Sequence, residues 1–245
     1  MKLLLALTAF ALPLSVSANL PTHQGTLIEL DNGYYSILYN CEKRGYEHYF
    51  YVTQADTGNV KRKSGFFQDT RLPKKCQQYG TFTYKTPRKS PKFDRGHGVP
   101  ANHMDFDKKA SDSTNAFSNI VPQSAPLNRQ GLWRHTDKLI ECNRDNGPIT
   151  VYGGVIWGDD KSNDYFVDSH GVETPDFLYK IIIKPTGERN AWVMPNSNVA
   201  KENNADNYLV SVSYIESQTG VIFDLPNKHN VAAKSFSLPS SCDLS

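Results

Sequence analysis

The chain has 245 residues, and its 27 basic and 25 acidic side chains leave a formal net charge of +2. A hydrophobic content of 38%, without low-complexity tracts or repeats, is ordinary for a globular protein and excludes a fibrous or repeat architecture. This length suffices for one large domain with a sizeable core, which we prefer over two small domains.

The first residues have the pattern of a secretory signal peptide. Met1 and Lys2 give a short basic start, residues 3–14 form an apolar run, and small residues follow up to Ala18. The run is too short to span a membrane, and no later segment is apolar enough to do so. The alternative is a buried N-terminal helix. We predict a signal peptide at residues 1–18, a single soluble domain at residues 19–245, and secretion to the periplasm or the extracellular space, with no membrane partner.

The chain contains four cysteines, which are Cys41, Cys76, Cys142 and Cys242. An even number behind an export signal argues for two disulfides. Their wide separation does not suit zinc, which usually takes close pairs of ligands. Four cysteines allow three pairings, and the sequence does not choose among them. We favour Cys41 with Cys76 and Cys142 with Cys242.

The first part of the domain is predicted to form strands followed by a basic loop. Residues 26–30 and 34–39 flank Asn32-Gly33, a strong hairpin turn signal, and residues 49–53 form a third strand. Segment 61–95 then carries 11 Lys and Arg residues against two acids, with aromatic residues interleaved. Such a segment can follow a phosphate backbone. The alternative is a solvated loop whose charges only keep the chain soluble.

A central helix is predicted in the middle of the chain. Residues 115–121 favour a short strand, and a helix begins near Leu127 with Pro126 in its first turn. Asn146-Gly147-Pro148 ends that helix.

The remaining residues favour strands and one late helix. Branched and aromatic side chains mark three core strands, at residues 149–157, 177–183 and 191–194. Residues 208–217 form a helix that Thr219-Gly220 ends. The order of elements predicts an α+β fold with a mainly antiparallel sheet.

One short motif carries chemistry. Asp94-Arg95-Gly96-His97 brings an acid, a cation and a base within four residues. Hydrolysis of a phosphodiester needs a group that takes a proton from water, and the ordinary pKa of His suits that work. A guanidinium such as Arg95 meets the charge on phosphate oxygens. Asn128 offers a neutral carbonyl oxygen, and Mg²⁺ accepts such sparse protein ligation because it keeps several of its waters.

Four ordered elements between residues 94 and 133 make the pattern specific. They are Asp94 to His97, Ala101 to His103, Ser118 to Gln123, and Leu127-Asn128 with Trp133. Together they resemble the DNA/RNA non-specific endonuclease family, which includes secreted bacterial nucleases and mitochondrial endonuclease G. A thinner similarity continues through residues 151–154, 171–180 and 211–220.

The resemblance implies a ββα-metal nuclease fold, with the general base on a hairpin and the metal ligand on the catalytic helix packed against it. His97 is then the general base, Asn128 is the direct protein ligand of Mg²⁺, and Arg95 contacts the phosphate. Mn²⁺ or Ca²⁺ can take the place of Mg²⁺. The expected activity is sequence-nonspecific hydrolysis of DNA and RNA through backbone contacts, which gives 5′-phosphate products.

The spacing after the metal ligand departs from the family pattern. Four residues separate Asn128 from Trp133, where the family usually has three, and a helix cap or bulge can absorb the difference. The family places a Glu four residues beyond this Trp, near the water shell of the metal. The matching residue here is Asp137, a shorter carboxylate, and Glu141 is the alternative one turn further.

A second family Arg precedes the motif and corresponds to Arg62 or Arg71. We favour Arg62 as a catalytic and substrate-binding residue, because the Phe66 to Asp69 stretch follows it as in the family. The alternative is an exposed Arg without a role.

Other residues near the motif have structural interpretations. His103 is expected to orient its loop rather than bind metal, since Mg²⁺ does not favour imidazole. Asn119 and Gln123 are expected to satisfy backbone groups that position the hairpin. Asp94 orients a neighbour, and Trp133 belongs to the core.

Two other functions compete with the nuclease. The first is a catalytically impaired, secreted nucleic-acid-binding protein of the same fold, which the altered spacing and Asp137 would support. The second is a disulfide-stabilised structural domain that carries the motif by coincidence. The sequence does not distinguish DNA from RNA preference or single from double strands, and no motif encodes an oligomeric state.

Overall fold

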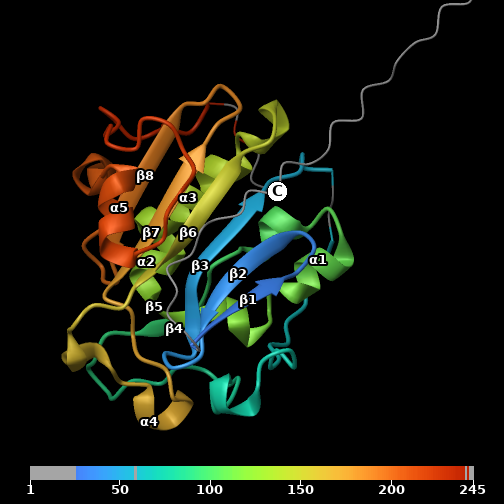
Figure 1. The fold of residues 1–245 in the computed structure, drawn as a ribbon, viewed down its shortest axis with the longest axis vertical. Helices are drawn as coiled ribbons and strands as arrows, with labels where there is room; N and C mark the ends of the chain where they lie inside the picture. Colours follow the sequence, from blue (N-terminus) through green and yellow to red (C-terminus); the bar gives the residue numbers. More distant parts are fainter. Residues whose placement is uncertain (1–25, 58–59, 241, 243–245) are drawn as a thin grey trace, which may run out of the picture.

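Six strands form the main sheet in the part of the chain that the structure, a computed structural model, describes: residues 26–57, 60–240 and Cys242. The order is β1-β2-β3-β6-β7-β8, and all neighbours are antiparallel (Figure 1). The strands are β1 Leu27–Asp31, β2 Tyr35–Asn40, β3 Gly45–Val52, β6 Thr150–Ile156, β7 Phe177–Ile183 and β8 Arg189–Pro195. The predicted α+β fold with a mainly antiparallel sheet is confirmed, while the predicted signal peptide, residues 1–18, lies outside the described residues.

The first hairpin follows its turn signal. Gly33 has a φ of +76°, which glycine adopts without strain, and its N–H donates to Asp31 Oδ1 at 2.7 Å. β3 begins at Gly45, four residues before the strand expected at residues 49–53. The early half was missed because His48 interrupts the apolar pattern. This His is nevertheless buried, with its Nδ1 2.8 Å from the Tyr179 hydroxyl.

A second, two-stranded sheet precedes the central helix. β4 (Phe93–His97), which no local pattern predicted, pairs with β5 (Ile120–Ser124) in a register that sets His97 opposite Ile120. Helix α2 (Ala125–Gln130) starts directly after β5, with Pro126 in its first turn as expected. Two strands and a helix are therefore arranged as the resemblance implied.

The strand expected at residues 115–121 exists only from Ile120 onward. Phe117–Asn119 forms a 3₁₀ turn (η3) instead. The Asn119 side chain explains the turn, because its Nδ2 donates to the carbonyl oxygens of Val99 and Thr114, both at 2.9 Å. These bonds compete with a strand ladder.

The predicted single helix after Pro126 is wrong, because it is two helices. α2 ends at Gln130, and α3 (Leu132–Glu141) starts two residues later. Gly131 lies between them in an extended conformation, with φ −86° and ψ −166°. A Cβ at this position would lie 2.7 Å from the Leu127 Cα and 2.9 Å from the Ala200 carbonyl oxygen, so the close approach requires glycine. The break thus falls within the four residues that separate Asn128 from Trp133.

Each face of the main sheet is covered. α3 and the β4–β5 layer pack on one face, over a core that includes Trp133, Trp192 and Met194. Helix α5 (Val212–Thr219) packs on the other, where Ile215 lies among aromatic residues (Figure 1). The helix predicted from residue 208 starts later, because the Ser211 side chain accepts from the Tyr214 N–H and caps it.

The remaining elements are short. They are α1 Lys108–Ser113, α4 Val167–His170, and the 3₁₀ turns η1 Lys74–Cys76, η2 Ala101–Met104, η4 Arg144–Asn146, η5 Lys161–Asn163 and η6 Glu202–Tyr208. Disulfides join Cys41 to Cys76 and Cys142 to Cys242, which confirms the favoured pairing. Among the described residues, every helix is too short or too polar to cross a bilayer.

Candidate active site

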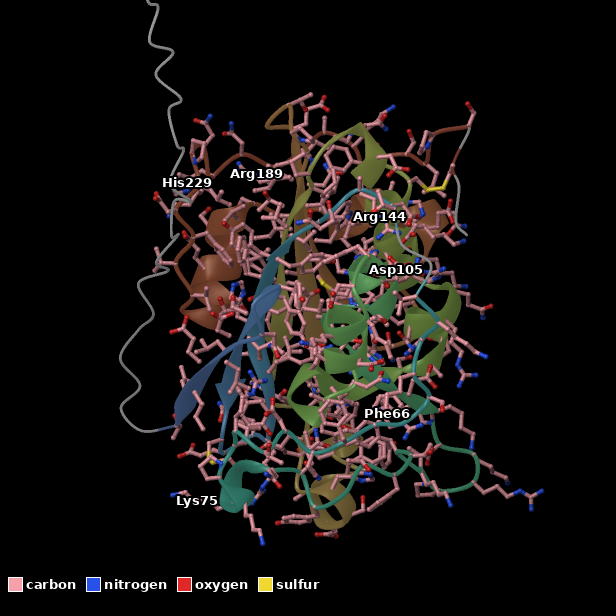
Figure 2. All side chains as sticks on the ribbon, turned by 90° about the vertical axis from the view of Figure 1, so that its right-hand side faces the viewer. Phe66, Lys75, Asp105, Arg144, Arg189 and His229 are labelled. Atoms are coloured by element: carbon pink, nitrogen blue, oxygen red, sulfur yellow. A yellow bond between two sulfur atoms is a disulfide. The ribbon has the colours of Figure 1, made fainter. Side chains whose placement is uncertain are left out.

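A cleft of about 700 Å³ opens beside the β4–β5 layer. Its walls come from β4, from α2 and α3, from η2 and from the segment that contains Phe66. Phe66 and Asp105, which both line it, are labelled in Figure 2. All five residues to which the sequence assigned site roles line this cleft, namely Arg62, Arg95, His97, Asn128 and Asp137.

His97 ends β4 with its ring half-buried, and a neighbouring amide fixes its tautomer. The His97 Nε2 lies 3.0 Å from Asn115 Oδ1, and Asn115 Nδ2 donates to the Lys63 carbonyl oxygen at 2.8 Å. Because that carbonyl oxygen only accepts, the Asn115 amide oxygen faces the ring and Nε2 carries the hydrogen. His97 Nδ1 is then the atom with a lone pair, which a proton acceptor needs.

Asn115 was not recognised in the sequence as a site residue. It lies 18 residues beyond His97 and on a different element, so only the tertiary fold brings the two together. No local spacing signals this contact.

Arg62 approaches the same side of the His97 ring, with Nη2 3.4 Å from Nε2. Since both nitrogens carry hydrogens, this contact is electrostatic rather than a hydrogen bond. Burial first, and then the Arg62 charge, lower the pKa of His97 to about 4. The ring is therefore neutral near pH 7. Arg71 is bound elsewhere, because its guanidinium pairs with Asp69.

Phe66 supports both groups of the motif. The Arg95 guanidinium carbon lies 3.9 Å from the centre of the Phe66 ring, and the His97 ring centre lies 5.5 Å from it. Arg95 Nη1 also donates to the Thr81 carbonyl oxygen at 2.9 Å. Arg95 is thus held at the cleft wall by stacking and by one hydrogen bond, which leaves its other N–H groups for a phosphate.

Asp94 orients Asn128, as expected for a neighbour-orienting acid. Asn128 Nδ2 donates to Asp94 Oδ2 at 2.9 Å, and Arg129 donates to both Asp94 oxygens at 2.9 and 2.6 Å. A carboxylate only accepts, so the Asn128 amide nitrogen faces it and Oδ1 is turned away as a potential ligand atom.

This donor set fits a hard cation. The side-chain oxygens of the cleft include those of the Asn128 amide and of the carboxylates of Asp94, Asp105 and Asp137. Within the described ranges, no group of three or more His, Cys, Asp or Glu side chains is arranged to hold a metal. A cation here must keep most of its waters, as Mg²⁺ does.

Asp137, rather than Glu141, lies at the cleft. The Asp137 Oδ1 accepts from Lys180 Nζ at 2.6 Å. Glu141 points elsewhere, where its Oε1 accepts from the buried Arg144 at 2.7 Å. The geometry therefore favours Asp137 as the carboxylate near a bound cation.

His103 is buried outside the cleft lining. Its Nε2 donates to the Asp137 carbonyl oxygen at 3.2 Å, and its Nδ1 accepts from the Tyr51 hydroxyl at 2.7 Å. Burial lowers its pKa to about 3, so the ring is neutral. These bonds tie η2 to α3 and β3, in line with an orienting role.

Asn119 and Gln123, the two amide side chains of the Ser118 to Gln123 stretch, differ in their hydrogen bonding. Asn119 fixes backbone groups as expected, because its Oδ1 also accepts from the Val99 N–H at 2.9 Å. The expectation for Gln123 is wrong: this buried side chain has no hydrogen-bond partner among the described residues. It packs over Gly96, where a Cβ would collide with it, so this close approach requires glycine.

Comparisons with known proteins identify the family and the fold of this chain. The model of the DNA/RNA non-specific endonuclease family matches residues 17–230. Mitochondrial endonuclease G of Bos taurus is 29% identical over 147 residues, which are 55% of this chain and 48% of that protein. Mitochondrial nuclease 1 of Schizosaccharomyces pombe is 25% identical over 214 residues, which cover 78% of this chain and 64% of that protein. The chain thus spans about half the length of the endonuclease G that it matches.

A solved structure shares the fold. The crystal structure of an EndoG/EndoGI complex, which describes EndoG inhibition, aligns with a TM-score of 0.62 at 21% identity. The alignment covers 80% of this chain and 84% of that chain. The predicted ββα-metal nuclease fold is confirmed. With a family model that matches most of its length, the chain belongs to the DNA/RNA non-specific endonuclease family.

Proposed function

We propose that this protein is a sequence-nonspecific endonuclease that hydrolyses DNA and RNA phosphodiesters with the aid of Mg²⁺ and gives 5′-phosphate products. The observation that carries the proposal is one cleft that holds a neutral His97 with Nδ1 unprotonated, beside Asn128, Arg95 and Arg62. A base, a hard-cation ligand and phosphate-binding cations are the groups that this hydrolysis needs.

Asn128 would hold the cation through Oδ1, since Asp94 fixes the other end of the amide. A bound Mg²⁺ supplies charge stabilisation for the phosphate and the leaving oxygen, and Mn²⁺ or Ca²⁺ are substitutes of similar ligand preference. Asp137 also lines the cleft, where its carboxylate can accept hydrogen bonds from metal-bound water.

His97 Nδ1 takes a proton from water as the water oxygen attacks the phosphorus. The bond from phosphorus to the 3′ oxygen breaks, and that oxygen takes a proton from a solvent water, which leaves a 3′-hydroxyl and a 5′-phosphate. Asn115 Oδ1 accepts from Nε2 throughout, so it keeps Nδ1 aimed and stabilises the imidazolium that forms. The guanidinium groups of Arg95 and Arg62 meet the charge on the non-bridging oxygens.

The lining of the cleft favours the nucleic-acid backbone over the bases. Four arginines line it, namely Arg62, Arg95, Arg129 and Arg134. Guanidinium groups pair with phosphate oxygens in any sequence, so binding through them carries no sequence preference. Such binding weakens steeply as salt rises.

We also propose that the protein is exported behind the predicted signal peptide. The two disulfides support this, since such bonds persist in oxidising compartments. Expression of the full chain with an N-terminal sequence read of the product tests it. Cleavage after Ala18 is expected, and retention of Met1 in a reduced cellular fraction would contradict it.

The test of function uses purified mature protein on matched DNA and RNA, with Mg²⁺ or with a chelator. We expect cleavage of both substrates only with the cation, and loss of cleavage in His97→Ala. His229→Ala is the matched control, because this exposed histidine lies outside the cleft lining and should leave cleavage unchanged. Binding without any metal-dependent cleavage would instead favour the impaired nucleic-acid-binding protein.

A further inference from the structure

A lysine lies completely buried beneath the cleft. Lys180 is 0% exposed in the middle of β7, with Gly153 of β6 opposite it on one side and Trp192 of β8 on the other. Its Nζ lies 2.6 Å from Asp137 Oδ1 and 3.7 Å from the centre of the Trp133 ring. Burial of an ammonium is costly unless it is paired, so these two contacts explain its position.

Three acids among the described residues line the cleft, and each is paired with a cation: Asp94 with Arg129, Asp105 with Arg144, and Asp137 with Lys180. The pairs differ in how exposed the cation is. Asp94 is paired with Arg129, whose side chain is 69% exposed and therefore free to turn toward a substrate. Asp137 is paired with Lys180, which the sheet and Trp133 hold in place. The Lys180–Asp137 pair is therefore rigid, as is the pair of Asp105 with the buried Arg144, whereas the Asp94–Arg129 pair is adaptable.

The contact sets what Asp137 presents to the cleft. Lys180 occupies Oδ1, and only 10% of the Asp137 side chain is exposed. The atom that remains for the cleft is Oδ2, whose direction is fixed once Oδ1 is anchored. The buried ammonium also offsets the desolvation of this carboxylate.

We propose that Lys180 is a positioning residue for the hydrolysis: it anchors one oxygen of Asp137 so that the other faces the water shell of the cation on Asn128. The inference rests on the proposed function. It also accounts for the shorter acid at this position, because an aspartate anchored from below reaches the cleft in one defined orientation. Asp137 acts on water, and Lys180 acts only through Asp137.

A double-mutant cycle tests this inference. Lys180→Met keeps the length of the side chain and its packing on Trp133 but removes the charge. We expect it to lower kcat/KM with Mg²⁺ and the affinity for Mn²⁺, each by about tenfold to a hundredfold. In the Asp137→Asn background, the same substitution should change neither quantity by more than about twofold, since its target is already lost.

Lys184→Met is the matched control on the same stretch of chain. Lys184 also lies over an aromatic ring, 4.1 Å from the Phe236 centre, and is 3.5 Å from Glu188, but it does not line the cleft. Its loss should leave Mn²⁺ affinity and cleavage unchanged. Circular dichroism and thermal melting of each variant report whether it folds.

The outcomes separate cleanly. Should Lys180→Met fail to fold, the doubly substituted protein, which buries no unpaired charge, is compared with Asp137→Asn alone, and equal Mn²⁺ affinity supports the inference. Additive losses of kcat/KM or of Mn²⁺ affinity in the cycle would overturn the positioning role of Lys180. Wild-type Mn²⁺ affinity in a folded Lys180→Met protein would do the same. Neither result would affect the proposed function. A wild-type protein that neither binds Mn²⁺ nor cleaves would remove the proposed function, and this inference with it.

Discussion

Tyr179 and Lys180 are neighbours on β7, yet their side chains face opposite sides of the main sheet. Tyr179 faces α5 and joins an apolar cluster with Ile181 and Phe223. Lys180 faces α3 and pairs with an acid of the cleft. One face is built as an ordinary core, and the other buries charge beside a reactive site.

Two histidines, His48 and His97, have similarly lowered pKa values but different surroundings. Burial lowers the pKa of both His48 and His97 to about 4. The His48 ring is enclosed by Tyr152, Tyr179 and Phe223, whereas His97 lies at the cleft wall. A depressed histidine pKa alone therefore does not identify a base; access to the cleft does.

The largest effects on activity and stability should come from replacing each of these two histidines by alanine in separate variants. His97→Ala is expected to lower kcat by about 10²- to 10⁴-fold with little change in stability. His48→Ala should cost about 2–4 kcal/mol in the free energy of unfolding, because it leaves a cavity and an unpaired Tyr179 hydroxyl, and should leave kcat near wild type. Denaturant melts and kinetics on both variants measure this. An equal loss of kcat in the two variants would contradict the assignment of the base to His97 rather than His48.

Substitutions of Asn115 test the role of its hydrogen bond to His97. Asn115→Leu removes the hydrogen bond to His97 Nε2, so we expect kcat to fall about tenfold to a hundredfold. Asn115→Asp places a carboxylate there, which favours the imidazolium and raises the pKa of His97. The acid limb of the kcat/KM profile, which reflects loss of the neutral base, should then move to higher pH. An unmoved limb would show that another group titrates.

A smaller effect concerns the arginines. Arg134 lines the cleft on α3, and Arg134→Gln should weaken binding to DNA and RNA of any sequence alike. The slope of log affinity against log salt should become shallower by about one. Lys138→Gln, one turn further along α3 and outside the lining, serves as the control. A sequence-dependent loss would argue against backbone recognition.

The smallest effect is on stability against pH. His48 has its pKa lowered in the folded state, so the unfolded chain binds the extra proton between pH 6.5 and about 4. Stability from this group is present above 6.5 and is lost as pH falls toward 4. His48→Gln should therefore reduce the slope of the free energy of unfolding against pH by up to about 1.4 kcal/mol per pH unit in that window. Denaturant melts of the wild type and of His48→Gln at pH 7 and pH 5 measure the two slopes. Equal slopes for the two proteins would contradict the lowered pKa of His48.

The local sequence predicts part of this molecule well. Alternating apolar strands and the Asn32-Gly33 turn indicate the sheet, and the stretch from Asp94 to Trp133 indicates the residues that line the cleft. These signals succeed because side-chain periodicity and spacing along one element are local properties.

The remainder depends on contacts between distant segments. Asn115 and Lys180 meet the cleft only after folding, and nothing in their flanking residues marks them as site residues. The break at Gly131 arises from its close approach to the Ala200 carbonyl oxygen, nearly 70 residues away in the chain. Tertiary packing also decides that Gln123 is buried without a hydrogen bond.

Chemical rescue of His97→Ala examines the proton acceptor most directly. Added imidazole can occupy the space that the side chain leaves and take the proton in its place. With Mg²⁺ and plasmid DNA, we predict a variant that is nearly inactive and regains cleavage in proportion to the imidazole concentration. A variant that cleaves at the wild-type rate without imidazole would contradict the assignment of the base to His97.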